Sequence, residues 1–222
     1  MKTFAVIPAY NEEATIADVL TITRAYVDGI IVVDDGSTDR TAEIAGAQGA
    51  TVVRHGINRG LGAAIGTGFA AAQKLGADVV ITLDADGQHD PVEIQSFIQA
   101  IEQGADVVIG SRMLTGLVGM PWYRRVAQLL GNLVTFFLFG AWVTDSQSGF
   151  RAFTASALEK IQIKTNRMEV SSELVAETKR NRLTLVEVPI KAIYTEYSLS
   201  KGQSFFVGLK TLLKLVLRRI NQ

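Results

Sequence analysis

The first half of the chain alternates short apolar runs, rich in β-branched residues, with segments of helical pattern. The apolar runs cover residues 3–7, 30–33, 51–54, 78–83 and 106–109, and the helical patterns cover 12–26, 38–48, 61–75 and 91–103. Strands that are apolar throughout are buried on both faces, and helices between such strands are typical of a parallel sheet. The sequence therefore predicts an α/β fold in which helices cover both faces of a mostly parallel sheet.

The second half of the chain does not keep this alternation. Its segments are an apolar, loop-rich stretch over 113–143, a helical pattern over 172–180, two short strand patterns within 183–194 around Pro189 and an amphipathic pattern over 204–221. The sequence contains neither an internal repeat nor a linker. We expect one domain over residues 1–203, followed by a basic amphipathic helix over 204–222.

Composition excludes several classes of protein. A chain of 222 residues buries about 70% of its unfolded surface, so it needs neither a disulfide nor a structural metal. The sequence has no cysteine, which excludes Cys-ligated zinc, iron–sulfur clusters and a thiol nucleophile. Its 22 basic residues balance 22 acidic ones, which argues against a nucleic-acid partner. The apolar stretch 4–7 is too short for a signal peptide, so we expect a cytoplasmic protein.

Two neighbouring carboxylates follow the second apolar run. In open α/β sheets, ligands bind at the carboxyl ends of the strands, which is where Asp34 and Asp35 stand. Helix capping by Asn11 or Ser37 explains other polar residues at these strand ends but not this pair. Adjacent carboxylates repel one another unless they meet donors or a cation. We therefore expect a ligand that carries hydrogen-bond donors, such as a nucleobase edge and ribose hydroxyls.

The fourth apolar run ends in a second acidic motif. If the strand continues through Asp84 and Asp86, both carboxylates project from one face. Two hard oxygen ligands and the amide oxygen of Gln88 suit Mg²⁺ or Mn²⁺ bound together with substrate phosphates. His89 is interpreted as a polar residue at a helix start ahead of Pro91 rather than as a further ligand.

A glycine-rich segment and an arginine complete the polar residues at the predicted strand ends. The segment 58–64 lacks both the Lys-Ser/Thr end of a P-loop and an intact dinucleotide fingerprint. We interpret Gly60 and Gly62 as sites of close backbone packing near the nucleotide. Arg112 follows the fifth run, where a guanidinium could neutralise a diphosphate leaving group.

Six motifs in this order resemble one enzyme family. They are Pro8-Ala9-Tyr10-Asn11-Glu12, Val33-Asp34-Asp35-Gly36-Ser37-Thr38-Asp39, Asn58-Arg59-Gly60, Asp84-Ala85-Asp86-Gly87-Gln88, Ser111-Arg112 and Ser148-Gly149-Phe150-Arg151. Over residues 3–200 the chain resembles family-2 glycosyltransferases of GT-A fold. Within them it is most similar to the dolichol-phosphate mannose synthase and polyprenol-phosphate glycosyltransferase group.

The resemblance implies roles for individual residues. The residues that it assigns to the nucleotide sugar are Pro8, Tyr10, Glu12, Val33, Asp35, Asp84, Ala85, Arg112 and Lys201. It assigns Asp86 and Gln88 to a Mg²⁺ or Mn²⁺ ion, and it counts Asp84, Asp86, Arg112 and Arg125 as catalytic. Arg112 and one arginine of the Arg124–Arg125 pair would face the acceptor phosphate. The family usually has an arginine shortly before Lys201, where this chain has 195–197 as Thr-Glu-Tyr. The departure leaves open the sugar and the choice between a GDP-linked and a UDP-linked donor.

The reaction that the resemblance implies is an inverting displacement with polyprenyl phosphate as acceptor. A lipid phosphate is already anionic, so this reaction needs no general base. The alternative is a hydroxyl acceptor in polysaccharide or glycoprotein synthesis, for which Glu169 and Glu173 are candidate bases if they are not surface carboxylates. A second alternative is a non-catalytic module that binds a nucleotide sugar or a protein. The intact set Asp84, Asp86, Gln88 and Arg112 argues against it.

A lipid acceptor requires contact with a membrane. The segment 113–143 is expected on the acceptor side, with Trp122 and Trp142 as interface anchors. Its uncharged stretch 126–144 is expected to form a buried or interfacial helix, and not a membrane span. Lys210, Lys214 and Arg218 recur every four residues opposite an apolar set, which indicates a helix on an anionic membrane surface or against a membrane-protein partner. We expect a peripheral protein on the cytosolic face of the membrane.

Overall fold

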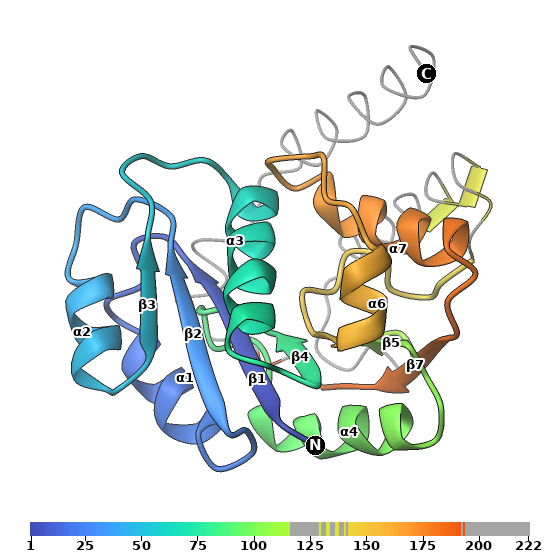
Figure 1. Cartoon of the computed structure of the whole chain (residues 1–222), viewed down its shortest axis with the longest axis horizontal. Coiled ribbons are helices and arrows are strands. Elements are labelled where there is room, and N and C mark those ends of the chain that lie inside the picture. The colour runs from blue at the N-terminus through green and yellow to red at the C-terminus, as the bar shows by residue number, and fades with distance from the viewer. Residues whose placement is uncertain are drawn as a thin grey trace.

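The computed structural model describes residues 1–115, 129, 132–133, 136–137, 140, 142–191 and 193 (Figure 1). In this part of the chain, seven strands form one sheet of order β3-β2-β1-β4-β6-β5-β7. The strands are β1 (Thr3–Ala9), β2 (Gly29–Asp34), β3 (Thr51–Arg54), β4 (Val79–Thr82), β5 (Val107–Ser111), β6 (Arg151–Thr154) and β7 (Leu185–Pro189). The helices are α1 (Ile16–Thr23), α2 (Thr41–Ala47), α3 (Leu61–Lys74), the 3-10 turn η1 (Pro91–Glu93), α4 (Ile94–Glu102), α6 (Ala155–Lys160) and α7 (Val170–Arg180).

The alternation of side chains along the strands explains the layers. In β1, Ala5 and Ile7 belong to a core cluster with residues of α1, α2 and α4, whereas Phe4 and Val6 belong to a second cluster with residues of α3, α6 and α7. Successive side chains of a strand point to opposite faces, so both faces of the sheet need a cover of helices. The predicted α/β fold with helices on both faces is confirmed (Figure 1).

One strand breaks the parallel order. β1 pairs in parallel with β2 and β4, and β5 pairs in parallel with β7, but β6 lies antiparallel between β4 and β5. Neither β6 nor α6 was predicted, because four and six residues are too few for a periodic signal. The prediction of two strands around Pro189 is wrong, since Pro189 is the last residue of the single strand β7. Proline has no N–H for the ladder and fits such an end.

Several expectations lie outside the described residues. These are the basic helix over 204–222, most of the segment 113–143, and the side chains Trp122, Arg124, Arg125 and Lys201. Among the helices that the structure does describe, none is long and apolar enough to cross a membrane.

Candidate active site

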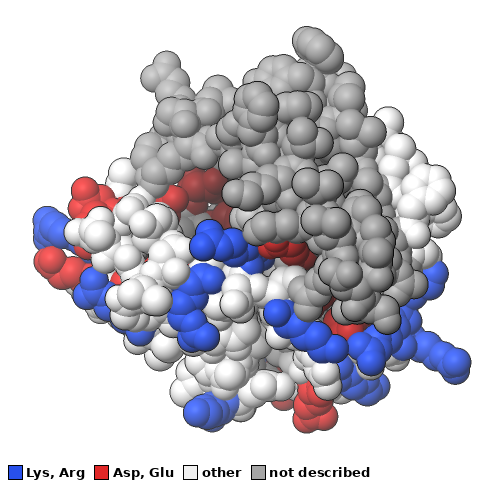
Figure 2. All heavy atoms as spheres, turned by 90° about the horizontal axis from the view of Figure 1, so that it is seen from above, with Lys and Arg blue, Asp and Glu red and all other residues white. Residues whose placement is uncertain are grey.

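The loops after β1, β2, β4 and β5 meet at one edge of the sheet, where these parallel strands have their carboxyl ends (Figure 1). Figure 2 looks onto this end of the molecule and shows acidic atoms in a recess, with basic side chains beside it.

The loops after β1 and β2 are joined by hydrogen bonds. The backbone N–H of Asn11 donates to Ser37 Oγ over 2.9 Å, and Thr38 N donates to Asn11 Oδ1 over 2.9 Å. Asn11 has a φ of 55°, which asparagine tolerates better than most residues.

The residues assigned to the nucleotide differ in their access to it. Pro8 lines the pocket described below, and Tyr10 is 46% exposed at the end of β1. Glu12 lies in the loop between β1 and α1, and its backbone N–H donates to Thr41 Oγ1 over 2.8 Å. Val33 is fully buried in the core cluster beneath α3, so its side chain presents no surface to a ligand.

The acidic pair after β2 is satisfied by the protein itself. Asp35 Oδ1 lies 2.7 Å from His55 Nδ1 and accepts from Arg59 N, and Asp35 Oδ2 accepts from Gly60 N over 2.7 Å. Asp34 Oδ2 lies 3.0 Å from Arg54 Nε. These donors come from the chain itself, so the pair alone does not require a ligand, and the predicted contact of Asp35 with a nucleotide stays a prediction. The sequence did not reveal these donors, because they come from β3 and from the loop that follows it.

The glycines at the start of α3 allow close backbone packing. A Cβ at Gly62 would lie 2.0 Å from the carbonyl oxygen of Thr165, and one at Gly60 would lie 2.4 Å from that of Asn166. The predicted close packing at these glycines is confirmed, with the segment before α7 as the partner, and their place near a nucleotide stays a prediction. Glu173 holds the same segment, because its carboxylate accepts from the backbone N–H groups of Lys164 and Thr165. Glu173 therefore has a structural role, and Glu169 lies buried just before α7.

The second acidic motif lies in a turn, and not on a continued strand. β4 ends at Thr82, so the expectation that the strand continues through both carboxylates is wrong. Asp86 accepts from the backbone N and the side-chain Nε2 of Gln88, over 3.0 and 2.6 Å. His89 Nε2 lies 3.0 Å from Asp84 Oδ2. The helix that follows is capped by Asp90, whose carboxylate accepts from Val92 N, so His89 is not the capping residue.

The two carboxylates differ in their pKa. Burial tends to raise the pKa of Asp84, but the hydrogen bond with His89 and the charges of Arg112 and Arg151 hold it below its usual value. Burial and the charge of Asp84 raise the pKa of Asp86. A cation between the two carboxylates would relieve this repulsion. Among the described residues, no three His, Cys, Asp or Glu side chains cluster as metal ligands.

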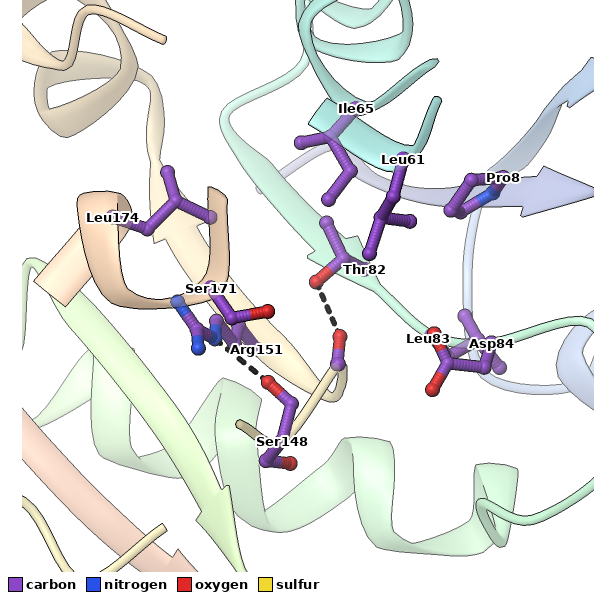
Figure 3. A pocket seen from close by; sticks show the side chains of 11 residues that line it. Pro8, Leu61, Ile65, Thr82, Leu83, Asp84, Ser148, Arg151, Ser171 and Leu174 are labelled. Atoms are coloured by element: carbon purple, nitrogen blue, oxygen red, sulfur yellow. Dashed lines mark hydrogen bonds between the residues drawn. The ribbon is translucent and has the colours of Figure 1, made fainter. Parts of the chain in front are cut away.

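A pocket opens beside Asp84, between α3 and α7 (Figure 3). Its lining residues are Pro8, Leu61, Ile65, Thr82, Leu83, Asp84, Ser148, Gly149, Arg151, Ser171 and Leu174. Arg151 is buried and donates to the carbonyl oxygens of Ser146 and Ser148, and burial lowers its pKa to about 10. Thr82 Oγ1 donates to the carbonyl oxygen of Gly149 over 2.7 Å. These bonds hold the loop before β6 against the acidic turn.

Gly149 allows this loop to approach Asp84. A Cβ at position 149 would lie 2.5 Å from Asp84 Oδ1, so Gly149→Ala is expected to displace the carboxylate and lower kcat/KM by about tenfold or more. The chain should still fold, because the Asp84 side chain is 40% exposed and can rotate. Steady-state kinetics and thermal unfolding test this. Gly56→Ala is the control, because a Cβ there meets nothing within 4 Å. Equal activity of the two variants would contradict the prediction.

Arg112 is held by a residue that the sequence analysis did not single out. Its Nε and Nη2 donate to the two oxygens of the fully buried Asp145 over 2.7 and 2.8 Å. The carboxylate of Glu187 on β7 accepts from the backbone N of Thr144 over 2.8 Å and from that of Asp145 over 3.3 Å. Arg112 lies at the predicted edge of the sheet, and its guanidinium forms an ion pair with the carboxylate of Asp145.

Comparisons with known proteins agree with this architecture. Residues 4–162 match the model of Glycosyl transferase family 2. The UDP-N-acetylglucosamine--dolichyl-phosphate N-acetylglucosaminyltransferase of Methanococcus voltae is 38% identical, with 99% of this chain and 96% of that protein covered. The polyprenol monophosphomannose synthase of Mycolicibacterium smegmatis is 33% identical, with 90% and 80% covered.

A solved structure supports the same assignment. The glucosyl-3-phosphoglycerate synthase of Mycobacterium tuberculosis, crystallised with Mn²⁺, UDP-glucose and phosphoglyceric acid, superposes with a TM-score of 0.73 at 25% identity. The match covers 98% of this chain and 79% of that one. The sheet with its acidic turn, the family model and these relatives together show that this chain belongs to the family-2 glycosyltransferases and has the GT-A fold.

Proposed function

We propose that this glycosyltransferase moves a sugar, with inversion, from a nucleotide-sugar donor to a polyprenyl phosphate in a reaction that depends on Mg²⁺ or Mn²⁺. The observation that carries the proposal is the pair Asp84 and Asp86 at the carboxyl edge of the sheet, with Arg112 close enough to lower the pKa of Asp84. The named relatives that use dolichyl and polyprenol phosphates support the acceptor. The name of the Methanococcus voltae relative and the UDP-glucose complex favour a UDP-linked over a GDP-linked donor.

In the proposed mechanism, this chain mainly binds and orients the substrates. Asp86 and Gln88 would hold the ion, which when bound stabilises the charge of the departing nucleoside diphosphate. Asp84 would orient the sugar, and Arg112, fixed by Asp145, would place a positive charge near the phosphates. Glu173 is engaged with backbone N–H groups, which agrees with a reaction that needs no carboxylate base. The phosphate of the acceptor attacks the anomeric carbon directly.

An exposed aromatic group supports contact with a membrane surface. Phe137 is 78% exposed and Trp142 is 58% exposed, and the ring of Phe136 contacts both of them. The amphipathic ring of Trp favours the interface of a bilayer, and exposed Phe rings bury at the boundary between headgroups and acyl chains. We propose that the chain acts peripherally at the cytosolic face of the membrane, where these rings contact the surface.

The test is a transfer assay with purified protein. UDP- and GDP-sugars are offered with Mn²⁺ or Mg²⁺ and a short polyprenyl phosphate, and labelled sugar is followed into the organic phase. We expect transfer from a UDP-sugar, its loss with EDTA and its recovery when the metal is restored. The matched control is the same polyprenol without phosphate, which should give no product. Transfer to a hydroxyl acceptor, with none to the lipid phosphate, would contradict the proposal.

A further inference from the structure

His89 is a buried histidine with one polar contact among the described residues. It is 6% exposed, its Nε2 lies 3.0 Å from Asp84 Oδ2, and its Nδ1 is buried without a hydrogen-bond partner in that part of the chain. Its ring lies 5.1 Å from the ring of Phe150, which stacks on Phe97 at 4.3 Å. The aromatic packing holds the imidazole in place, and its polar edge faces Asp84.

The direction of this hydrogen bond follows from its partner. The contact joins a ring nitrogen of His89 to a carboxylate oxygen of Asp84. An ionised carboxylate only accepts hydrogen bonds. The proton of the imidazole therefore stands on Nε2, and His89 donates to Asp84.

The same carboxylate is confined from a second side. The Cα of Gly149 lies so close that an added Cβ would come within 2.5 Å of Asp84 Oδ1 and 2.6 Å of Oδ2. The Asp84 side chain is nevertheless 40% exposed. His89 and Gly149 thus confine the carboxylate, while part of the side chain stays accessible.

We propose that His89 is a positioning residue, whose Nε2–H holds the carboxylate of Asp84 in the orientation that the sugar donor requires. This inference rests on the proposed function of Asp84. The competing explanation is that His89 fills space in the aromatic stack. Buried side chains commonly have only that role. A buried Nδ1 without a hydrogen-bond partner, however, lowers the stability of the folded protein, and phenylalanine would fill the same space without this cost.

Two substitutions separate these explanations. His89→Phe keeps a ring against Phe150 and removes both the donor and the unpartnered Nδ1. It is therefore expected to be at least as stable as the wild type in urea unfolding, while kcat falls by about 10- to 100-fold. His89→Gln loses the ring but places an amide N–H near the position of Nε2. It is expected to be less stable than His89→Phe, yet to recover most of kcat.

A third variant controls for loose packing. Phe97→Leu weakens the aromatic stack without removing a donor, so it should lower stability and leave kcat within about twofold of the wild type. Donor affinity, measured by titration calorimetry with the UDP-sugar and Mn²⁺, should change by less than about threefold in all three variants. A His89→Phe enzyme with the kcat of the wild type, or a His89→Gln enzyme slower than His89→Phe, would overturn the role of His89.

Two rate measurements distinguish a failure of the role of His89 from a failure of the proposed acceptor. All rates are measured both as transfer to polyprenyl phosphate and as slow hydrolysis of the donor, which needs Asp84 but no lipid. A wild-type enzyme that hydrolyses the donor without forming lipid product would overturn the proposed acceptor. The order of the variants in the hydrolysis assay would still decide whether His89 positions Asp84.

Discussion

Asp86→Asn is expected to lower the rate of sugar transfer by at least about 100-fold without lowering the free energy of unfolding. The Asn side chain keeps an oxygen that can accept from Gln88 N, so the turn should be preserved. It removes the negative charge that the proposed Mg²⁺ or Mn²⁺ ion requires. The loss of rate then reports the loss of the ion and of its stabilisation of the leaving diphosphate.

The expected stability follows from the sign of the pKa shift. Burial and the charge of Asp84 raise the pKa of Asp86 in the folded chain, so folding is disfavoured by the ionised carboxylate above that pKa. This cost is absent at low pH and appears as the pH rises through the ordinary value towards the raised one. At neutral pH, Asp86→Asn removes it, and the variant should unfold at the same or a higher urea concentration.

The measurement combines transfer rate, metal titration and urea unfolding of the same preparations. Wild-type activity should saturate with Mn²⁺, whereas Asp86→Asn should need far more metal or show no response. Asp90→Asn is the matched control, because Asp90 lies on the same turn and its amide form still accepts from Val92 N. A variant that transfers sugar at the rate of the wild type with unchanged metal dependence would exclude Asp86 as a ligand.

Asp145→Ala is expected to destabilise the protein by about 3 kcal/mol and to abolish most of its activity. Asp145 is fully buried and accepts from Nε and Nη2 of Arg112, whose side chain is 20% exposed. Without Asp145, a largely buried guanidinium loses its counter-charge. We place the expected loss at the lower end of the range for buried pairs because Arg112 keeps some contact with water.

A double variant separates stability from catalysis. Arg112→Met with Asp145→Ala removes both charges, so it should recover part of the stability that Asp145→Ala alone loses, but none of the activity. Urea unfolding and transfer rates of the single and double variants complete the cycle. Glu43→Ala is the control for surface charge, because the Arg40–Glu43 pair is exposed and its loss should not change stability measurably. Additive losses of stability in the double variant would contradict the coupling.

The sequence by itself determined the layered fold and the edge on which the site lies. The apolar run 51–54 became the edge strand β3 with the predicted bounds. The run 30–33 became β2, which is one residue longer at each end and is buried over 30–34. Burial on both faces requires such runs, and parallel strands place their carboxyl ends on one edge. The acidic residues 34–35 and 84–86 were therefore located by local patterns alone.

Only the tertiary structure decided which partner each of these residues meets. Asp35 is held by His55 and by the backbone of the next loop, Asp84 by His89 and Gly149, and Arg112 by Asp145. Most of these partners lie 20 or more positions away in sequence. The antiparallel β6, which brings residues 148–151 beside the acidic turn, left no periodic signal in its four residues. Periodicity reports which face of an element is buried, whereas contacts between distant segments depend on strand order, register and close packing, which no local pattern carries.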